Sequence, residues 1–247
     1  MSASTTITLI TGPNRGIGHG ILATLLARPN NTLIAAVRDP EAPLSKALND
    51  LPKGEGSSLI LIKIDQSVPT DAAAAIKSLD GIDRIDTLVA NAAMADLCVS
   101  VMETPAEDVR RHMDINLLGV LTLFQAAEPL LKKSTKAKLV VLSSALGSAT
   151  LCTAMPGPWF CYGVTKAALN YLVRRIHVEH DWLAATVLQP GWVQTDMGTL
   201  AAKSIGMESA PMKLEDSVAG CVRVVDAVSR EKYNGEWVDS EEKPVPW

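Results

Sequence analysis

The chain is poor in the features that mark several large classes of protein. Aromatic residues make up only 4% of its 247 residues, and the net charge of −4 leaves no basic excess of the kind that nucleic acid selects. No uninterrupted apolar run approaches the roughly 20 residues that span a bilayer, and the first residues lack the pattern of a secretion signal. We therefore expect neither nucleic acid nor a membrane as a partner.

Cysteine is also scarce. No C-x-x-C pair and no His at ligand spacing accompanies the four cysteines, Cys98, Cys152, Cys161 and Cys221. This excludes a zinc site and a disulfide framework, so we predict no metal and a reduced, cytoplasmic setting. Three histidines in helical segments are expected to lie on helix surfaces rather than to act as general bases: His112, His177 and His180.

The chain does have a 47% hydrophobic composition, arranged as strand-like runs that alternate with helical patterns. Strands are predicted over 6–10, 32–37, 59–64, 87–90, 138–142 and 185–188. Helices are predicted over 19–27, 71–79 and 106–132, with a further one beginning near Tyr162. This alternation is typical of βαβ units. We predict one α/β domain over 1–247, a doubly wound Rossmann-type fold with a mostly parallel seven-stranded sheet and helices on both faces.

A glycine-rich turn follows the first strand. Glycines there let the backbone approach a ligand closely, and the next helix offers free N–H groups to a pyrophosphate. The spacing differs from G-x-G-x-x-G, so a plain strand-to-helix turn is the alternative. The predicted binding residues of this turn are Gly12, Asn14, Arg15, Gly16, Ile17 and Gly18.

The ends of the second and third strands bear on the choice of cofactor. Arg38 ends the second strand, where a doubly wound fold meets the adenosine ribose. With Arg15 it could bind a 2′-phosphate, which favours NADP (NADPH), whereas Asp39 keeps NAD open. Asp65 and Gln66, at the end of the third strand, are placed to contact adenine.

Two segments with Asn lie further along. Asn91 and Ala92 follow the fourth strand, where small residues allow a cofactor to approach. Asn116 interrupts the long helix, and Asn is a poor residue inside a helix. It is predicted to mark a functional bulge, with a satisfied buried amide as the alternative.

Tyr162 and Lys166 share a face at the start of a helix. A phenol has a pKa of about 10, so it exchanges protons at neutral pH only if a nearby cation favours the phenolate. Lys166 is within reach to do so, although Tyr-x-x-x-Lys also arises by chance.

Together these residues carry a resemblance over nearly the whole chain. The following residues occur in order along the chain: Thr11-Gly12 with Gly16-Ile17-Gly18, Asp65, Asn91-Ala92, Asn116, Ser144, Tyr162 with Lys166, and Pro190-Gly191 with Thr195. A chain with this set resembles the short-chain dehydrogenases/reductases, with similarity to small carbonyl and ketone reductases. It departs from the family at Pro13, at Ala93 in place of Gly, and in a long connection between Ser144 and Tyr162.

The resemblance implies a mechanism. Tyr162 would protonate the alkoxide of a small-molecule carbonyl substrate, and Ser144 would bind the same oxygen. Lys166 would lower the pKa of Tyr162 and hold the nicotinamide ribose, so that Tyr162 and Lys166 also count among the cofactor-binding residues. Asn116 would position a water that restores the proton. The nicotinamide would be held by Pro190, Gly191, Val193 and Thr195. The alternative is an NADP-binding member with a non-redox task, such as an epimerase, a cyclase or a sensor.

Two segments are expected to wall the substrate pocket. The predicted pocket residues are Met94, Leu146, Met155, Trp159, Phe160, Trp192, Met197 and Leu200, and they favour a bulky, weakly polar ketone or aldehyde. The alternative is that Trp159 and Phe160 only anchor their loop. Residues 197–212 are predicted to form a lid.

The resemblance further implies a homodimer or homotetramer in which two long helices meet their symmetry mates. The apolar positions considered for that interface are Leu118, Leu121, Phe124, Leu169 and Leu172, some of which must face the sheet instead.

Overall fold

The computed structural model describes residues 5–96, 99–155 and 157–247, so Cys98 lies outside the described residues. Seven strands form one sheet in the order β3-β2-β1-β4-β5-β6-β7, and every neighbouring pair is parallel. The strands are β1 (Thr6–Thr11), β2 (Asn31–Val37), β3 (Ser58–Lys63), β4 (Thr87–Ala90), β5 (Lys138–Leu142), β6 (Ala184–Gln189) and β7 (Trp237–Asp239). The predicted α/β class is confirmed.

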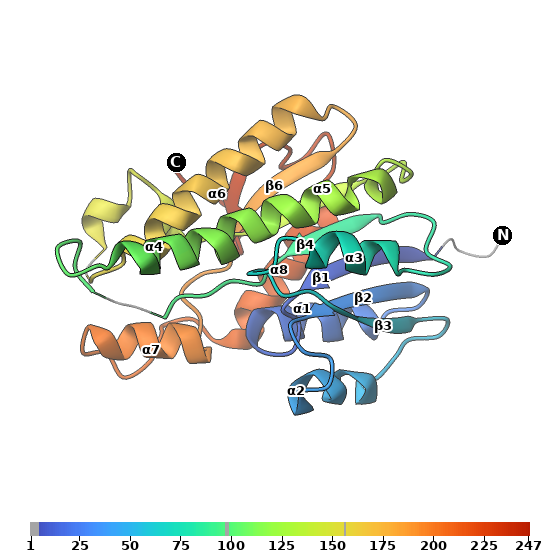
Figure 1. The fold of residues 1–247 in the computed structure, drawn as a ribbon, viewed down its shortest axis with the longest axis horizontal. Coiled ribbons are helices and arrows are strands. Elements are labelled where there is room, and N and C mark those ends of the chain that lie inside the picture. Colours follow the sequence, from blue (N-terminus) through green and yellow to red (C-terminus); the bar gives the residue numbers. More distant parts are fainter. Residues whose placement is uncertain (1–4, 97–98, 156) are drawn as a thin grey trace.

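Helices cover both faces of this sheet (Figure 1). One layer contains α1 (Gly16–Leu26) and α8 (Leu214–Ala227), and the other contains α3 (Asp71–Lys77), α5 (Gly119–Leu131) and α6 (Phe160–Glu179). Successive strand residues point to opposite layers: Leu9 packs with α5 and α6, whereas Ile10 packs with α1 and α8. Both faces are buried, which explains why the strands read as nearly continuous apolar runs.

The long helix predicted over 106–132 contains a bulge. α4 (Ala106–Met113) passes into a π turn, Asp114–Leu118, before α5 begins. Asn116 lies in this turn and is fully buried, so the predicted bulge is confirmed. Such turns occur often at functional sites.

His112 is not on a helix surface, and that prediction is wrong. The side chain is fully buried on α4, which packs against α6, and its Nδ1 lies 2.7 Å from the Asp108 carbonyl oxygen. A backbone oxygen can only accept, so Nδ1 carries the proton. Nε2 has no hydrogen-bond partner among the described residues.

Short elements complete the chain: α2 (Pro43–Lys46), α7 (Asp196–Ser204), and 3₁₀ turns over Ala47–Asp50, Ala145–Gly147 and Cys152–Ala154. In the part of the chain that the structure describes, no helix is long and apolar enough to cross a membrane, and no group of His, Cys, Asp and Glu could hold a metal ion.

The order in which the chain adds strands reverses between β1 and β4. In open α/β sheets, ligands bind at this kind of reversal, just outside the carboxyl ends of the strands. The glycine-rich turn follows β1, Asn91 follows β4, and Ser144 lies just after β5. The topology therefore brings together segments far apart in sequence.

Candidate active site

The glycine-rich turn is shaped to receive a phosphate. Gly12 and Gly16 have φ of 63° and 57°, in the left-handed region that favours glycine. No side chain caps α1, and its first turn holds no acidic residue, so its N–H groups and positive dipole end are left for an anion. A Cβ added at Gly16 would lie 3.4 Å from Thr195 Cγ2. The turn thus faces the Pro190–Thr195 segment, and these residues fit a dinucleotide between them.

Asn91 holds this turn in place. Its Nδ2 donates to the carbonyl oxygens of Thr11, at 2.8 Å, and Gly12, at 3.1 Å. The Thr11 hydroxyl accepts the N–H groups of Asn91 and Ala92, both at 3.0 Å. Thr11 is a site residue beyond those predicted, and its place at the end of β1, directly before Gly12, is the signal for it in the sequence.

The two arginines expected to act together differ in their contacts. Arg15 Nη1 lies 3.6 Å from Asp196, in an exposed ion pair that contributes little to stability. Arg38 is exposed at the end of β2 and makes no ion pair within the described residues. Asp39 Oδ1 accepts the N–H of Glu41 at 2.9 Å, so that carboxylate is turned toward its own backbone. Of the two arginines, Arg38 is the one without an ion pair among the described residues.

Asp65 and Gln66 differ in how their side chains are satisfied. Asp65 Oδ1 accepts the N–H and the hydroxyl of Ser67, at 2.9 and 2.7 Å. Both amide atoms of Gln66 are buried without a partner among the described residues, and the side chain lies against Gly119.

Ser144 lies on a tight turn. It caps the 3₁₀ turn Ala145–Gly147, and its Oγ accepts the Leu146 N–H at 3.2 Å. The Ala145 N–H donates to Gln189 Oε1 at 3.0 Å, and the Ser143 N–H donates to the Leu188 carbonyl at 2.8 Å. The backbone around Ser144 is therefore fixed to β6.

Tyr162 and Lys166 lie one turn apart on α6, as predicted. Lys166 Nζ donates to the Leu142 carbonyl at 2.8 Å and lies 5.5 Å from the centre of the Tyr162 ring. Burial lowers the pKa of Lys166 to about 7 and raises the pKa of Tyr162 above its ordinary value. In the protein alone, desolvation outweighs the expected lowering of the Tyr162 pKa by Lys166, and both groups are pushed toward their neutral forms.

Asn116 uses its amide to join two segments. Its Oδ1 accepts the Met94 N–H at 2.8 Å, and its Nδ2 donates to the Met94 carbonyl at 3.0 Å and to Thr165 Oγ1 at 3.1 Å. The Thr165 hydroxyl donates in turn to the Tyr162 carbonyl at 2.8 Å. In this structure the side chain ties the chain after β4 to α6. These bonds occupy the Asn116 amide, whose predicted role is to position a water, and they add Thr165 to the residues around the site.

A short segment after β6 leads into α7 and is bonded to Met212. The Gln194 N–H donates to the Met212 carbonyl at 2.8 Å, and the Met212 N–H donates to the Trp192 carbonyl at 3.0 Å. Val193 is buried, and Pro190 accepts the Ser217 hydroxyl at 2.7 Å. Gly191 has φ of 94°, and a Cβ there would meet Met212 Sδ at 2.4 Å. Both ends of the segment that carries α7 are thus tied together.

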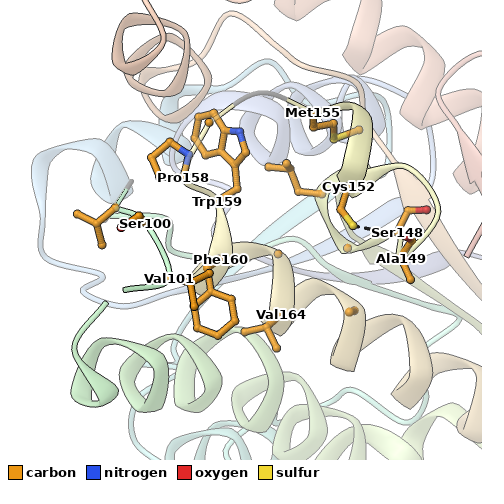
Figure 2. Close-up of a pocket in the computed structure, with 16 residues that line it drawn as sticks. Ser100, Val101, Ser148, Ala149, Cys152, Met155, Pro158, Trp159, Phe160 and Val164 are labelled. Atoms are coloured by element: carbon orange, nitrogen blue, oxygen red, sulfur yellow. Dashed lines mark hydrogen bonds between the residues drawn. The ribbon is translucent and has the colours of Figure 1, made fainter. Parts of the chain in front are cut away.

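A cavity of about 640 Å³ lies beside α6 (Figure 2). Four predicted pocket residues line it together, namely Leu146, Met155, Trp159 and Phe160. The other four, Met94, Trp192, Met197 and Leu200, are not among its lining residues, and neither are Ser144 and Tyr162. Gly163 and Val164 form part of its wall, so the cavity adjoins the outer side of the first turn of α6.

Known proteins share this arrangement over the whole chain. The model of the short chain dehydrogenase family matches residues 6–205. A norsolorinic acid ketoreductase of Dothistroma septosporum is 44% identical over 97% of this chain and 91% of its own length, and one of Aspergillus parasiticus is 36% identical over 98% and 91%.

Among solved structures, the NADPH-bound carbonyl reductase from chicken fatty liver is similar, with a TM-score of 0.86 at 30% identity, covering 99% of this chain and all of the other. The match in sequence and in fold, together with the Tyr162 and Lys166 pair beside Ser144, places this chain in the short chain dehydrogenase family, as an oxidoreductase that acts on carbonyl or hydroxyl groups.

Proposed function

We propose that the protein reduces a bulky, weakly polar ketone with NADPH, and that Tyr162 is the proton donor. The observation that carries the proposal is the placement of Ser144, Tyr162 and Lys166 at the carboxyl edge of the sheet, near an apolar cavity that Leu146 and Gly163, rather than the catalytic residues themselves, help to line. The substrates named for its relatives, norsolorinic acid and carbonyl compounds, support a ketone.

In the proposed reaction the Tyr162 hydroxyl donates its proton to the carbonyl oxygen while Ser144 donates a hydrogen bond to it. The chemistry that a bound reduced nicotinamide supplies is hydride for the carbonyl carbon. Proton transfer leaves Tyr162 as a phenolate, which the Lys166 ammonium stabilises until water restores the proton. The phenol is protonated at neutral pH and can donate, but burial raises the pKa of Tyr162 and so disfavours the phenolate, which is why the Lys166 ammonium is needed.

The apolar cavity supports a large substrate. The Trp159 ring packs over Gly157, where a Cβ would lie 2.5 Å from Trp159 Nε1, and Val99 forms a bridge with Trp159. Trp159 thus joins the two loops that border the cavity. The test compares kcat/KM for polycyclic aromatic ketones and for small polar ketones, in the parent and in Trp159→Ala. We expect a loss of roughly tenfold, confined to the polycyclic ketones. An equal effect on both classes would mean that Trp159 only packs the loop.

NADP is proposed over NAD because Arg38 is free and the Asp39 carboxylate is engaged by its own backbone. An arginine that binds a 2′-phosphate contributes roughly 1.5 to 3 kcal/mol. Arg38→Asp is therefore expected to lower kcat/KM with NADPH by roughly ten- to a hundredfold and to leave that with NADH nearly unchanged. Equal efficiency of the two cofactors in the parent would contradict the assignment.

Three further features are proposed on the same basis. Residues 197–212 act as a lid hinged at Trp192–Gln194 and Met212. The protein forms a homodimer or homotetramer through α5 and α6. It works in the cytoplasm, in keeping with the free thiols of Cys152, Cys161 and Cys221. Limited proteolysis with and without substrate tests the lid. Light scattering tests the oligomeric state, and cell fractionation tests the location.

A further inference from the structure

Asn170 is a buried amide on the face of α6 that carries the catalytic pair. It follows Lys166 by four residues and Tyr162 by eight, so the three lie on successive turns of one face. The side chain is only 3% exposed. Asn is a poor helix former, and a buried amide is costly unless it is hydrogen-bonded. Its presence here therefore calls for partners.

Those partners stand on either side of Ser144. The Ser143 hydroxyl donates to Asn170 Oδ1 at 2.5 Å, and Asn170 Nδ2 donates to the Gly147 carbonyl at 3.4 Å. Ser143 precedes Ser144, and Gly147 ends the 3₁₀ turn that Ser144 caps. One side chain thus holds both ends of the turn, the first bond being the shorter.

The turn also packs directly on the helix backbone. A Cβ at Gly147 would lie 2.7 Å from the Lys166 carbonyl carbon and 2.8 Å from the Ala167 nitrogen. Only glycine permits this approach, and Asn170 is the α6 side chain that is hydrogen-bonded to the turn at both ends. Asn170 therefore adds a side-chain link between the Ser144 turn and the helix that carries Tyr162.

We propose that Asn170 is a positioning residue that holds the Ser144 turn against α6, so that the Ser144 and Tyr162 hydroxyls meet the same carbonyl oxygen. The proposal rests on the proposed roles of Ser144 and Tyr162. Geometry matters strongly here, since a displacement of about 1 Å can cost roughly a hundredfold in rate.

The test uses Asn170→Leu and Ser143→Ala, which break the same hydrogen bond from its two ends. Each is expected to lower kcat by roughly ten- to a hundredfold. The dissociation constant of NADPH, measured by fluorescence, should stay within about twofold, because the Asn170 side chain bonds to Ser143 and Gly147 and not to a residue expected to bind the cofactor. The isotope effect with 4-deuterated NADPH should rise as hydride transfer becomes rate-limiting. The double variant should lose no more than the worse single variant, since both act on one contact.

Ser134→Ala is the matched control. The Ser134 hydroxyl is buried and donates to Asp86 at 2.6 Å, at the opposite edge of the sheet. Its loss should lower thermal stability and leave kcat within about twofold. If Asn170→Leu does not fold, Ser143→Ala, with its smaller change in volume, decides the matter.

A kcat near that of the parent in a folded Asn170→Leu or Ser143→Ala variant would overturn the proposal. So would a loss of kcat matched by an equal loss of NADPH affinity. Ser144→Ala is measured alongside: if it keeps full activity, the proposed role of Ser144 fails, whereas an inactive Ser144→Ala beside an active Asn170→Leu rejects the role of Asn170 alone.

Discussion

On α6, the face against the sheet carries polar groups among apolar core residues, and the outward face carries large apolar side chains beside charged ones. Thr165, Lys166 and Asn170 are at most 3% exposed, whereas Val164, Tyr171 and Val178 are 36%, 69% and 65% exposed. Each buried polar group has a partner, such as Leu142 for Lys166 and Ser143 for Asn170.

The difference indicates that the two faces serve different purposes. Buried polar groups cost free energy unless they are paired. Three of them on the buried face of one helix therefore point to chemistry rather than to packing. Apolar side chains on the surface point to contact with another molecule. The inner face is expected to determine the rate, and the outer face the assembly. The following changes test this division.

The largest effect is expected from Tyr162→Phe on the inner face. Loss of a positioned proton donor lowers rates by roughly 10²- to 10⁴-fold, and kcat for ketone reduction should fall by this much while NADPH still binds. Tyr171→Phe makes the same chemical change on the outer face of the same helix and should leave kcat within about twofold. Absorbance of NADPH measures both. A similar loss in the two variants would refute the division.

The second effect is a pH dependence set by Lys166. Its pKa is lowered to about 7, so it is an ammonium below that pH and neutral above it. The ammonium stabilises the Tyr162 phenolate that forms on proton donation. The kcat for reduction should therefore fall as pH rises through about 7 in the parent. Lys166→Met should have a low and flat profile, with roughly a tenfold loss at acid pH. If kcat of the Lys166→Met variant still fell near pH 7, the fall would belong to a group other than Lys166.

The third effect concerns Thr165, whose hydroxyl accepts a hydrogen bond from Asn116 and donates one to the Tyr162 carbonyl. Thr165→Val keeps the shape and removes both hydrogen bonds. Stability should fall by about 1 to 2 kcal/mol, and kcat should fall by roughly three- to tenfold because Asn116 and Tyr162 lose their link. Thr165→Ser retains the hydroxyl and should retain kcat. Denaturant unfolding together with kinetics separates the two effects.

Much of this arrangement could be predicted from the sequence, because local rules determine it. Alternating apolar runs gave β4 and β5 with their observed bounds, and the unusual Asn116 marked the π turn. What could not be predicted depends on contacts between distant segments. Arg15 meets Asp196, and His112 is buried by packing of α4 on α6, contacts that no spacing in the sequence reveals.

Asn170 lies between these cases. Its spacing of four from Lys166 was visible, yet its meaning came only from Ser143 and Gly147 on another segment. The residues considered for the interface could not be sorted from the sequence either. Phe124 and Leu169 are buried in the core, whereas Leu118 is 45% exposed. Which side of a uniformly apolar helix faces the sheet is decided by its packing.

The smallest effect on activity, and the clearest on assembly, is expected from Tyr171→Glu. Tyr171 lines an apolar groove of about 400 Å³ between the π turn and α6, formed with Leu117, Leu118, Leu121, Ala168, Leu172 and Arg175. In a two-fold interface each substitution appears twice, once from each copy, so two carboxylates would be buried within one contact. The variant should become a monomer by light scattering at micromolar concentration, with kcat within about twofold of the parent, since its inner face is untouched. Val178→Glu, on the same face but outside the groove, should weaken the assembly less than Tyr171→Glu. A parent that is itself monomeric would show that the apolar outer face of α6 serves some purpose other than pairing with a second copy.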